Sequence, residues 1–179
     1  MNRHSLKIIL ILLALSSSLA SQDIESLPCD PKDNMPIILG LTTRDMILKH
    51  RAVFSSSESL IKLSPETINR WKNIDRDIRI IIVFGSWCSD SHANLPGILA
   101  LDKIKNTRVK IDYIGVGRSK EINSQDWPRS LPRQSLTLVP TLWIFDNIDG
   151  VWNLNGSIVE NPTDRLKTMA DELLDLIVD

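Results

Sequence analysis

The residues with the clearest chemical potential lie in segment 85–91, Gly-Ser-Trp-Cys-Ser-Asp-Ser, which holds a single cysteine, Cys88. A short apolar, largely β-branched run precedes this segment and a stretch compatible with a helix follows it, so Cys88 is expected where a buried strand gives way to a helix. At such a junction, unpaired backbone N–H groups and the positive end of the helix dipole favour the thiolate, which is the nucleophilic form of cysteine. The sequence therefore predicts Cys88 as a catalytic thiol. The alternative is a small buried residue that fills the junction.

Four neighbouring side chains are predicted to support Cys88. Ser91 is expected to hydrogen-bond the sulfur, although a serine in the first helical turn can also satisfy backbone groups. Asp90 would stabilise the helix N-terminus, but its negative charge opposes a thiolate. His92, one helical turn beyond Cys88, would favour the thiolate if protonated and is otherwise a solvated surface histidine. Trp87 would shield the sulfur and contact partners, or would simply pack against a nearby loop.

The elements that position these side chains follow from the pattern of apolar residues. A strand over 79–85 should lead into a helix over 89–104. The later elements expected are a strand over 109–116, a partly helical loop over 117–137, a strand over 141–145, a turn at Asp149-Gly150, an edge strand over 151–154 and a terminal helix opening at 161–164. This order predicts a mixed sheet covered by helices.

The N-terminal part is expected to begin irregularly, because proline and glycine punctuate residues 21–41. A helix capped by Thr42 or Thr43 should then run to about Phe54, where the three serines at 55–57 should break it. Ser64-Pro65 supplies a capping serine followed by proline, which predicts a further helix ending near Asn73.

Residues 1–20 have the features of a secretory signal peptide, with Arg3 and Lys7 before an apolar run over 8–15 and small residues up to Ala20. An uncleaved membrane anchor is the alternative, but the run is well short of the roughly 20 residues that span a bilayer. Cleavage after Ala20 would export a chain of 159 residues to the periplasm or the exterior, and would lower the net charge from −1 to −3. That chain fits one domain.

Composition argues against several classes of function. No basic excess indicates nucleic-acid binding, no later apolar stretch indicates a membrane span, and two cysteines are too few for a disulfide scaffold. The two histidines of the mature chain, His50 and His92, have no metal-ligand spacing with the cysteines. Neither a metal nor another cofactor is therefore expected.

Several spaced motifs give the chain a resemblance to the thioredoxin family. Trp87-Cys88 stands at the strand–helix junction, Pro96 follows eight residues after Cys88, Val139-Pro140-Thr141 opens the third strand, and Gly156 lies sixteen residues after Pro140. The resemblance covers about 62–178 and looks like a branch of exported bacterial proteins with a Trp-Cys-x-Asp-Ser site. It implies an α/β, thioredoxin-like fold. A central mixed sheet of four or five strands flanked by helices would occupy 62–179, with an N-terminal helical extension over 21–61.

The same resemblance implies how a substrate would bind. The bond before Pro140 would be cis, with Pro140 opposite Cys88, and the backbone from Val139 to Thr141 would bind an extended substrate segment. The alternative for Pro140 is an ordinary turn proline.

Three departures from the family pattern change the implied chemistry. Ser91 stands where thioredoxins carry a second, resolving cysteine, and Ile82 stands where they bury an acid that serves that cysteine. The path from Cys88 to Pro140 is also longer, so 117–137 could rebuild the substrate rim. The dithiol half-reaction should therefore be absent.

The resulting hypothesis is an exported thioredoxin-fold protein that performs one-thiol thiol–disulfide exchange through Cys88 with protein or small-molecule partners. Cys29 could resolve the mixed disulfide, could pair stably with Cys88, or could remain free. The rival hypothesis is a redox-inactive module that captures extended peptides or assists assembly in the cell envelope.

Overall fold

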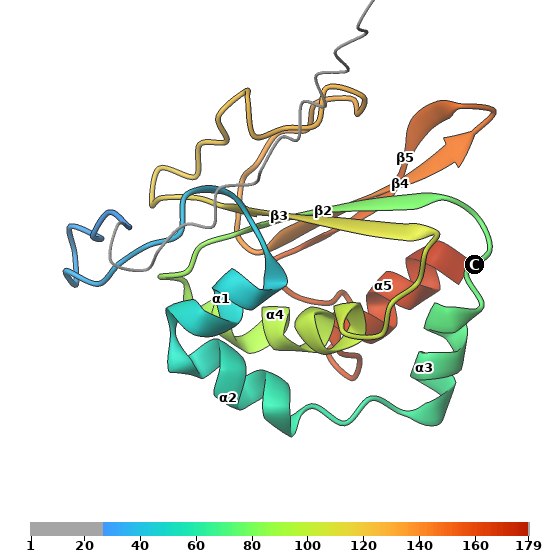
Figure 1. Cartoon of the computed structure of the whole chain (residues 1–179), viewed down its shortest axis with the longest axis horizontal. Coiled ribbons are helices and arrows are strands. Elements are labelled where there is room, and N and C mark those ends of the chain that lie inside the picture. The colour runs from blue at the N-terminus through green and yellow to red at the C-terminus, as the bar shows by residue number, and fades with distance from the viewer. Residues whose placement is uncertain (1–26, 179) are drawn as a thin grey trace, which may run out of the picture.

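A single five-stranded sheet with helices packed on it organises the chain, as a computed structural model of residues 27–178 shows (Figure 1). The strand order is β1-β3-β2-β4-β5; β2 runs parallel to β3, and the other neighbours pair antiparallel. The strands are β1 (Gly40–Thr42), β2 (Ile78–Phe84), β3 (Val109–Gly115), β4 (Thr141–Ile148) and β5 (Val151–Val159). The predicted α/β fold with a mixed sheet is confirmed. The predicted signal peptide over 1–20 lies outside the described residues.

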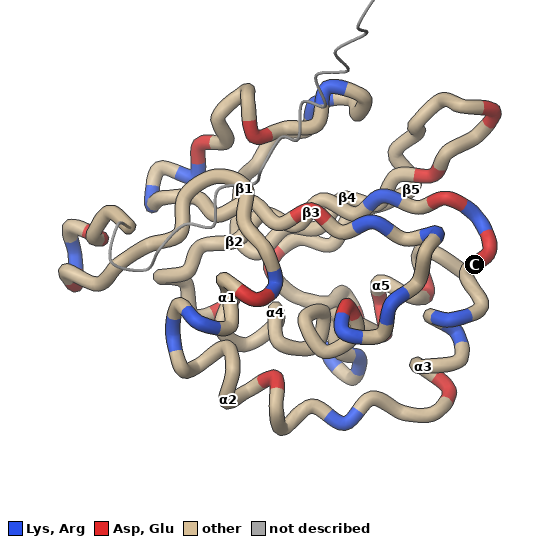
Figure 2. The backbone as a smooth tube through the Cα atoms, viewed as in Figure 1, with Lys and Arg blue, Asp and Glu red and all other residues tan. Residues whose placement is uncertain are grey.

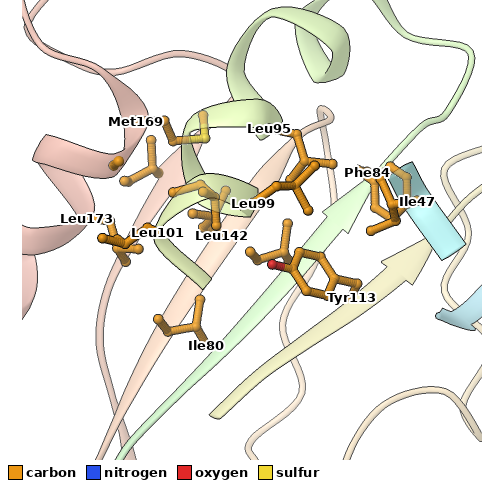
Figure 3. Packing of buried hydrophobic residues seen from close by; sticks show 14 of the residues in the cluster. Ile47, Ile80, Phe84, Leu95, Leu99, Leu101, Tyr113, Leu142, Met169 and Leu173 are labelled. Carbon is orange, nitrogen blue, oxygen red and sulfur yellow. The ribbon is translucent and has the colours of Figure 1, made fainter. Parts of the chain in front are cut away.

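The helices lie together on one face of the sheet (Figure 1). They are α1 (Arg44–His50), α2 (Ala52–Leu60), α3 (Pro65–Lys72), α4 (Ser89–Asp102) and α5 (Met169–Val178). Side chains of α4 and α5, such as Leu95, Leu99 and Leu173, pack against Phe84 and Leu142 of the sheet (Figure 3). Because successive strand residues point to opposite faces, Ile80 and Ile82 of β2 join this helical core.

The opposite face of the sheet is covered by irregular chain rather than by helices. Ile81 and Val83 of β2 pack there against Trp127 and Leu131, which lie in the connection between β3 and β4. The expectation that 117–137 is partly helical is wrong, because this segment forms turns and extended stretches. Its tryptophan and leucine supply the apolar cover that a helix would otherwise give. β2 is thus buried on both faces, as its apolar run predicted.

Two helix boundaries differ from the sequence expectation. The break falls at Arg51, whose extended backbone separates α1 from α2, and the serines 55–57 lie inside α2. Within this helix, Ser55 Oγ donates to Ala52 O and Ser59 Oγ donates to Ser56 O, so these hydroxyls are satisfied by the backbone of the helix itself. The predicted caps are confirmed: Thr43 caps α1 and Ser64, followed by Pro65, caps α3.

The chain after β4 also differs. β5 extends to Val159 rather than Leu154, with a bulge at the pairing of Phe145 with Leu154. The last helix begins at Met169, later than expected, because Thr168 and Asp171 exchange backbone and side-chain hydrogen bonds there as a capping pair. At the other edge, the short strand β1 was not expected from the irregular composition of 21–41.

Candidate functional site

Cys88 lies at the N-cap of α4, directly beyond the carboxyl end of β2. Its N–H donates to Gly85 O at 2.9 Å, and its carbonyl accepts from His92 N at 3.0 Å. Both backbone groups of Cys88 are therefore hydrogen-bonded within the junction. The side chain makes no capping hydrogen bond to the first turn of the helix. Cys88 is 9% exposed, and its sulfur faces a cleft rather than the core interior. The predicted strand–helix placement of the thiol is therefore observed.

The sulfur of Cys88 lies against the segment before Pro140. The Sγ atom donates to Val139 O at 3.4 Å and lies 3.7 Å from Asp90 Oδ2. The Val139–Pro140 bond is cis, as the sequence predicted. Thr141 is buried and its hydroxyl donates to Leu138 O at 2.7 Å, so it shapes the turn rather than facing the sulfur.

An open cleft of about 590 Å³ surrounds the sulfur. Its walls come from five separate parts of the chain: Lys32 and Asp33; Trp87, Cys88, Ser89 and Asp90; Arg118 and Lys120; Leu138 and Val139; and Glu160. Both basic and acidic side chains line it, and both signs are also interspersed along the described chain (Figure 2). The cleft can therefore admit a polar chain next to the thiol.

One wall of the cleft is a hairpin over 28–37, which lies at the end of the sheet where β2 meets α4 (Figure 1). A β-bridge joins Cys29 to Pro36, and Ile37 N donates to Pro28 O at 2.8 Å. The hairpin is anchored on the junction, since Ile38 N donates to the buried Ser86 Oγ at 3.1 Å. The N-terminal segment is thus part of the site's wall.

A buried ion pair ties this hairpin to the rim of the cleft. Asp30 is fully buried and accepts from Arg118 Nε at 2.9 Å, while the second carboxylate oxygen lies 2.8 Å from Arg118 Nη2. The hydrogen bond from Arg118 lowers the pKa of the Asp30 carboxyl, against the opposing effect of burial. Arg118 in turn lies over the ring of Trp87, 4.7 Å from its centroid. The indole N–H of Trp87 donates to Val116 O at 2.9 Å, which fixes the ring.

The other two predicted supporting residues point elsewhere. Ser91 is fully buried and its hydroxyl accepts from Gly85 N at 3.2 Å, the backbone role weighed as the alternative. His92 Nε2 lies 2.8 Å from Ser86 O; because a carbonyl only accepts, that nitrogen carries the proton. The ring of His92 meets Phe54 of α2 edge-on at 5.1 Å, on the helical side of the sheet. Both residues stabilise the junction behind Cys88.

Cys29 and Cys88 are both free, with Cys29 exposed on the hairpin and Cys88 buried. Cys29 does not line the cleft, although Lys32 and Asp33 of the same hairpin do. A stable disulfide between the two cysteines is therefore not part of this structure.

Sequence reasoning missed Asp30, Arg118, Lys120 and Glu160. One signal was available for the two basic residues. They follow β3, which lies parallel to β2, and the carboxyl ends of parallel neighbours meet at one sheet edge, beside Cys88. No comparable signal marks Asp30, because only tertiary packing brings the hairpin to that edge.

Across residues 27–178, no group of three histidine, cysteine or acidic side chains is arranged to hold a metal ion. Within the same range, no helix has the length and apolar character needed to cross a bilayer.

The fold and the cysteine opposite a cis-proline define a thioredoxin-like protein, and comparison with known proteins agrees. A family model described as "Thioredoxin" matches residues 42–171, and the chain belongs to this family. Among solved structures, a protein of unknown function from Pseudomonas aeruginosa is similar at 21% identity, with a TM-score of 0.50, over 77% of this chain and 86% of that one. An HIV epitope-scaffold is similar at 21% identity with a TM-score of 0.45, over 77% of this chain and 76% of that one. No curated protein matches the chain.

Proposed function

We propose that this thioredoxin-like protein performs thiol–disulfide exchange with one cysteine, Cys88, in the cell envelope after export. The observation that carries the proposal is the position of the Cys88 sulfur, at a helix N-terminus, 3.4 Å from Val139 O and open to a cleft. In this arrangement a nucleophile and an extended backbone that can align a substrate disulfide meet at one point.

The reaction has two steps. The Cys88 thiolate attacks one sulfur of a substrate disulfide, forming a mixed disulfide and releasing the other sulfur as a thiolate. A second thiol then attacks the mixed disulfide, forms a new disulfide and regenerates the Cys88 thiolate. No net oxidation occurs, so the protein needs no electron donor. The second thiol would come from the substrate or from a small molecule. Attack by Cys29 on the Cys88 sulfur would instead leave a Cys29–Cys88 disulfide, which a further thiol must reduce before Cys88 can react again.

The absence of a resolving partner beside Cys88 supports exchange rather than dithiol reduction. Ser91 occupies the position one turn along α4, and its hydroxyl is engaged by Gly85 N. Ile82, a fully buried apolar residue of β2, stands where thioredoxins bury an acid. Neither residue can resolve the mixed disulfide or move a proton for a resolving thiol.

One observation favours the rival function, a binding module without redox turnover. Val139 O and Asp90 Oδ2 are both positioned to accept the thiol proton, and two oxygens beside a sulfur oppose its ionisation. If these oxygens dominate over the helix N-terminus, the cleft would capture extended peptides while Cys88 stays protonated.

The rate at which Cys88 is alkylated separates the two functions. We expect iodoacetamide at pH 6 to modify Cys88 at least about tenfold faster than it modifies free cysteine, because the thiolate is the reacting form. Cys29→Ser removes the second thiol from the measurement, and Cys88→Ser gives the background. A rate equal to that of free cysteine would support the binding module.

Formation of the mixed disulfide provides a second measurement. The Cys29→Ser protein should form an adduct with oxidised glutathione, detected by mass spectrometry, and added thiol should release it. The Cys29→Ser/Cys88→Ser protein, which has no cysteine, is the control and should form none. Failure of Cys29→Ser to form the adduct would contradict exchange through Cys88. For export, we expect protein recovered from the envelope to begin at Ser21, which its intact mass would show.

A further inference from the structure

We propose that Arg118 is a positioning residue that stabilises the Cys88 thiolate, and that Asp30 of the N-terminal hairpin holds Arg118 in place for this task. This inference rests on the proposed exchange function and names the group that makes its cysteine reactive. It assigns a role in the site to the hairpin over 28–37, which precedes the strand at which the family match begins.

Arg118 is held by more contacts than is usual for a side chain at the rim of a cleft. Its Nε donates to Asp30 Oδ1 at 2.9 Å, its Nη2 forms an ion pair with Asp30 Oδ2 at 2.8 Å, and the guanidinium lies 4.7 Å from the Trp87 ring centroid. These two contacts restrain the planar group from its edge and from its face. The side chain keeps 34% exposure, so it remains open to the cleft while Asp30 is sealed behind it.

Arg118 and Cys88 line the same cleft, and Trp87 adjoins both of them. The pKa of Arg118 is raised chiefly by the hydrogen bond to Asp30, and a charge interaction with Cys88 adds to the rise. Because the interaction between two charges is mutual, a cation that is favoured by the Cys88 thiolate also favours that thiolate.

The cleft that Cys88 lines carries charged side chains of both signs. They are Asp90 on α4, Arg118 and Lys120 after β3, Lys32 and Asp33 on the hairpin, and Glu160 after β5. Asp90, at 3.7 Å, opposes the thiolate directly. Lys120 is held by Thr137 O, and His92 by Ser86 O. Of the described cations, Arg118 is the one fixed beside the tryptophan that adjoins the cysteine.

The role of Asp30 follows from its burial. A buried carboxylate needs a paired cation, and here that cation is Arg118. The hairpin therefore cannot pack on the junction without Arg118 in its observed place. Conversely, Arg118 without Asp30 would keep its charge but lose its fixed direction.

The experiment measures alkylation of Cys88 by iodoacetamide from pH 4.5 to 9 in full-length mature protein carrying Cys29→Ser. We expect Arg118→Gln to move the midpoint of the pH–rate profile upward and to slow the reaction at pH 6 about three- to tenfold, because a nearby cation is lost. Arg118→Lys should restore part of the rate, since a charge returns without the planar fork. Asp30→Asn should fall between the parent protein and Arg118→Gln.

Two further variants separate this role from a structural one. Arg118→Gln alone leaves Asp30 buried without a partner, so the double variant Asp30→Asn/Arg118→Gln removes both charges and guards against unfolding. Arg133→Gln is the matched control: Arg133 also lies over a tryptophan ring, 5.4 Å from that of Trp127, but outside the cleft. It should leave the pH–rate profile unchanged.

The outcomes distinguish this inference from the proposed function. If the parent protein reacts no faster than free cysteine, the exchange function fails. If the parent is fast and the folded Arg118 variants keep its pH–rate profile, the exchange function stands and the role of Arg118 is refuted. A profile that moves equally in Arg133→Gln would also refute it.

Discussion

At the scale of single residues, the site is a balance of charges around one sulfur. The sulfur lies at a helix N-terminus and lines the same cleft as Arg118, and these two features are the basis of the proposed thiolate. It also lies 3.7 Å from Asp90 Oδ2 and 3.4 Å from Val139 O, which can accept a thiol proton. Ser91 and His92 do not enter this balance directly, because both are bound to backbone atoms of the preceding turn. Under the proposed function, the reactivity of Cys88 depends on Asp90, two residues away in sequence, and on Arg118, which only the fold brings to the cleft.

Replacing Ser91 by cysteine should add the missing half-reaction. Ser91 lies one turn along α4 from Cys88 and is fully buried, so a thiol there could attack a mixed disulfide from behind. We expect Ser91→Cys to acquire disulfide-reductase activity, measured as insulin reduction with dithiothreitol, that the parent lacks. Ser91→Ala is the control and should gain none. If Ser91→Cys also gains none, the prediction is wrong, and the groove or the proton route is missing as well as the thiol.

His50 should make stability depend on pH. It lies at the end of α1, and its pKa is lowered from 6.5 to about 4, first by burial, then by Arg51 and also by His92. The unfolded chain therefore binds a proton below pH 6.5 that the folded chain does not bind until about pH 4. The contribution of neutral His50 is fully present above pH 6.5 and is lost as pH falls towards 4.

Urea unfolding at pH 7 and at pH 4.5 measures this effect. We expect the parent to lose on the order of 2 kcal/mol more than His50→Gln over this range. Asp30 and Asp175, whose pKa values are lowered, lose their contribution at more acidic pH, and they do so in both proteins. Equal losses in the two proteins would show that His50 is not held neutral.

At the scale of elements, the backbone just after the hairpin, at Ile38, lies very close to the end of β3 at Gly115. A Cβ added at Gly115, the last residue of β3, would lie 2.4 Å from Ile38 O. Ile38 cannot move away easily, because its N–H bonds Ser86 Oγ. The contact explains why a glycine ends β3, beside the junction that carries Cys88.

We expect Gly115→Ala to destabilise the protein by about 3 kcal/mol, as overpacking against backbone does. Gly97→Ala, inside α4, is the matched control: its Cβ would meet Ala170 Cβ at an ordinary 3.8 Å. Because alanine favours helix more than glycine does, this change should stabilise by up to about 1 kcal/mol. Thermal unfolding followed by circular dichroism checks both signs, and loss of stability in both variants would contradict the argument.

At the scale of the whole molecule, helices bury one face of the sheet and the irregular chain between β3 and β4 buries the other (Figure 1). Trp127 is the centre of this second layer. It is 5% exposed and meets the ring of Trp143 edge-on, with centroids 5.4 Å apart. The same connection carries Leu138 and Val139 to the cleft, so its packing also sets the position of the cis-proline segment.

Trp127→Ala should therefore cost about 3 to 5 kcal/mol in the free energy of unfolding, because it empties this layer. Leu166→Ala, at a side chain that is 95% exposed, should change it by less than about 0.5 kcal/mol. Urea unfolding monitored by tryptophan fluorescence measures both. A loss below about 1 kcal/mol in Trp127→Ala would mean that the second layer contributes little to the core.

Much of the fold could be predicted from local sequence. The apolar run of β2 and the serine and proline before α3 predicted these two elements correctly. The resemblance carried by Trp87-Cys88 and Val139-Pro140-Thr141 implied the cis bond before Pro140, which the structure contains. The two elements could be predicted because periodicity and capping act within a few residues. The boundary at Arg51 and the late start of α5 could not be predicted in the same way. In both places several residues could begin or end a helix on local grounds, and tertiary packing decides which of them does.

The sequence by itself determined that a lone cysteine begins a helix after a buried strand, since the types and order of neighbouring residues are enough for that. Only the tertiary structure decided what surrounds its sulfur. Asp30 and Arg118 are 88 residues apart, and only the packing of the hairpin and the end of β3 against one sheet edge brings them together. Charge interactions act through space and carry no periodic signature along the chain, so the pair that we propose to act on Cys88 appears only once the chain has folded.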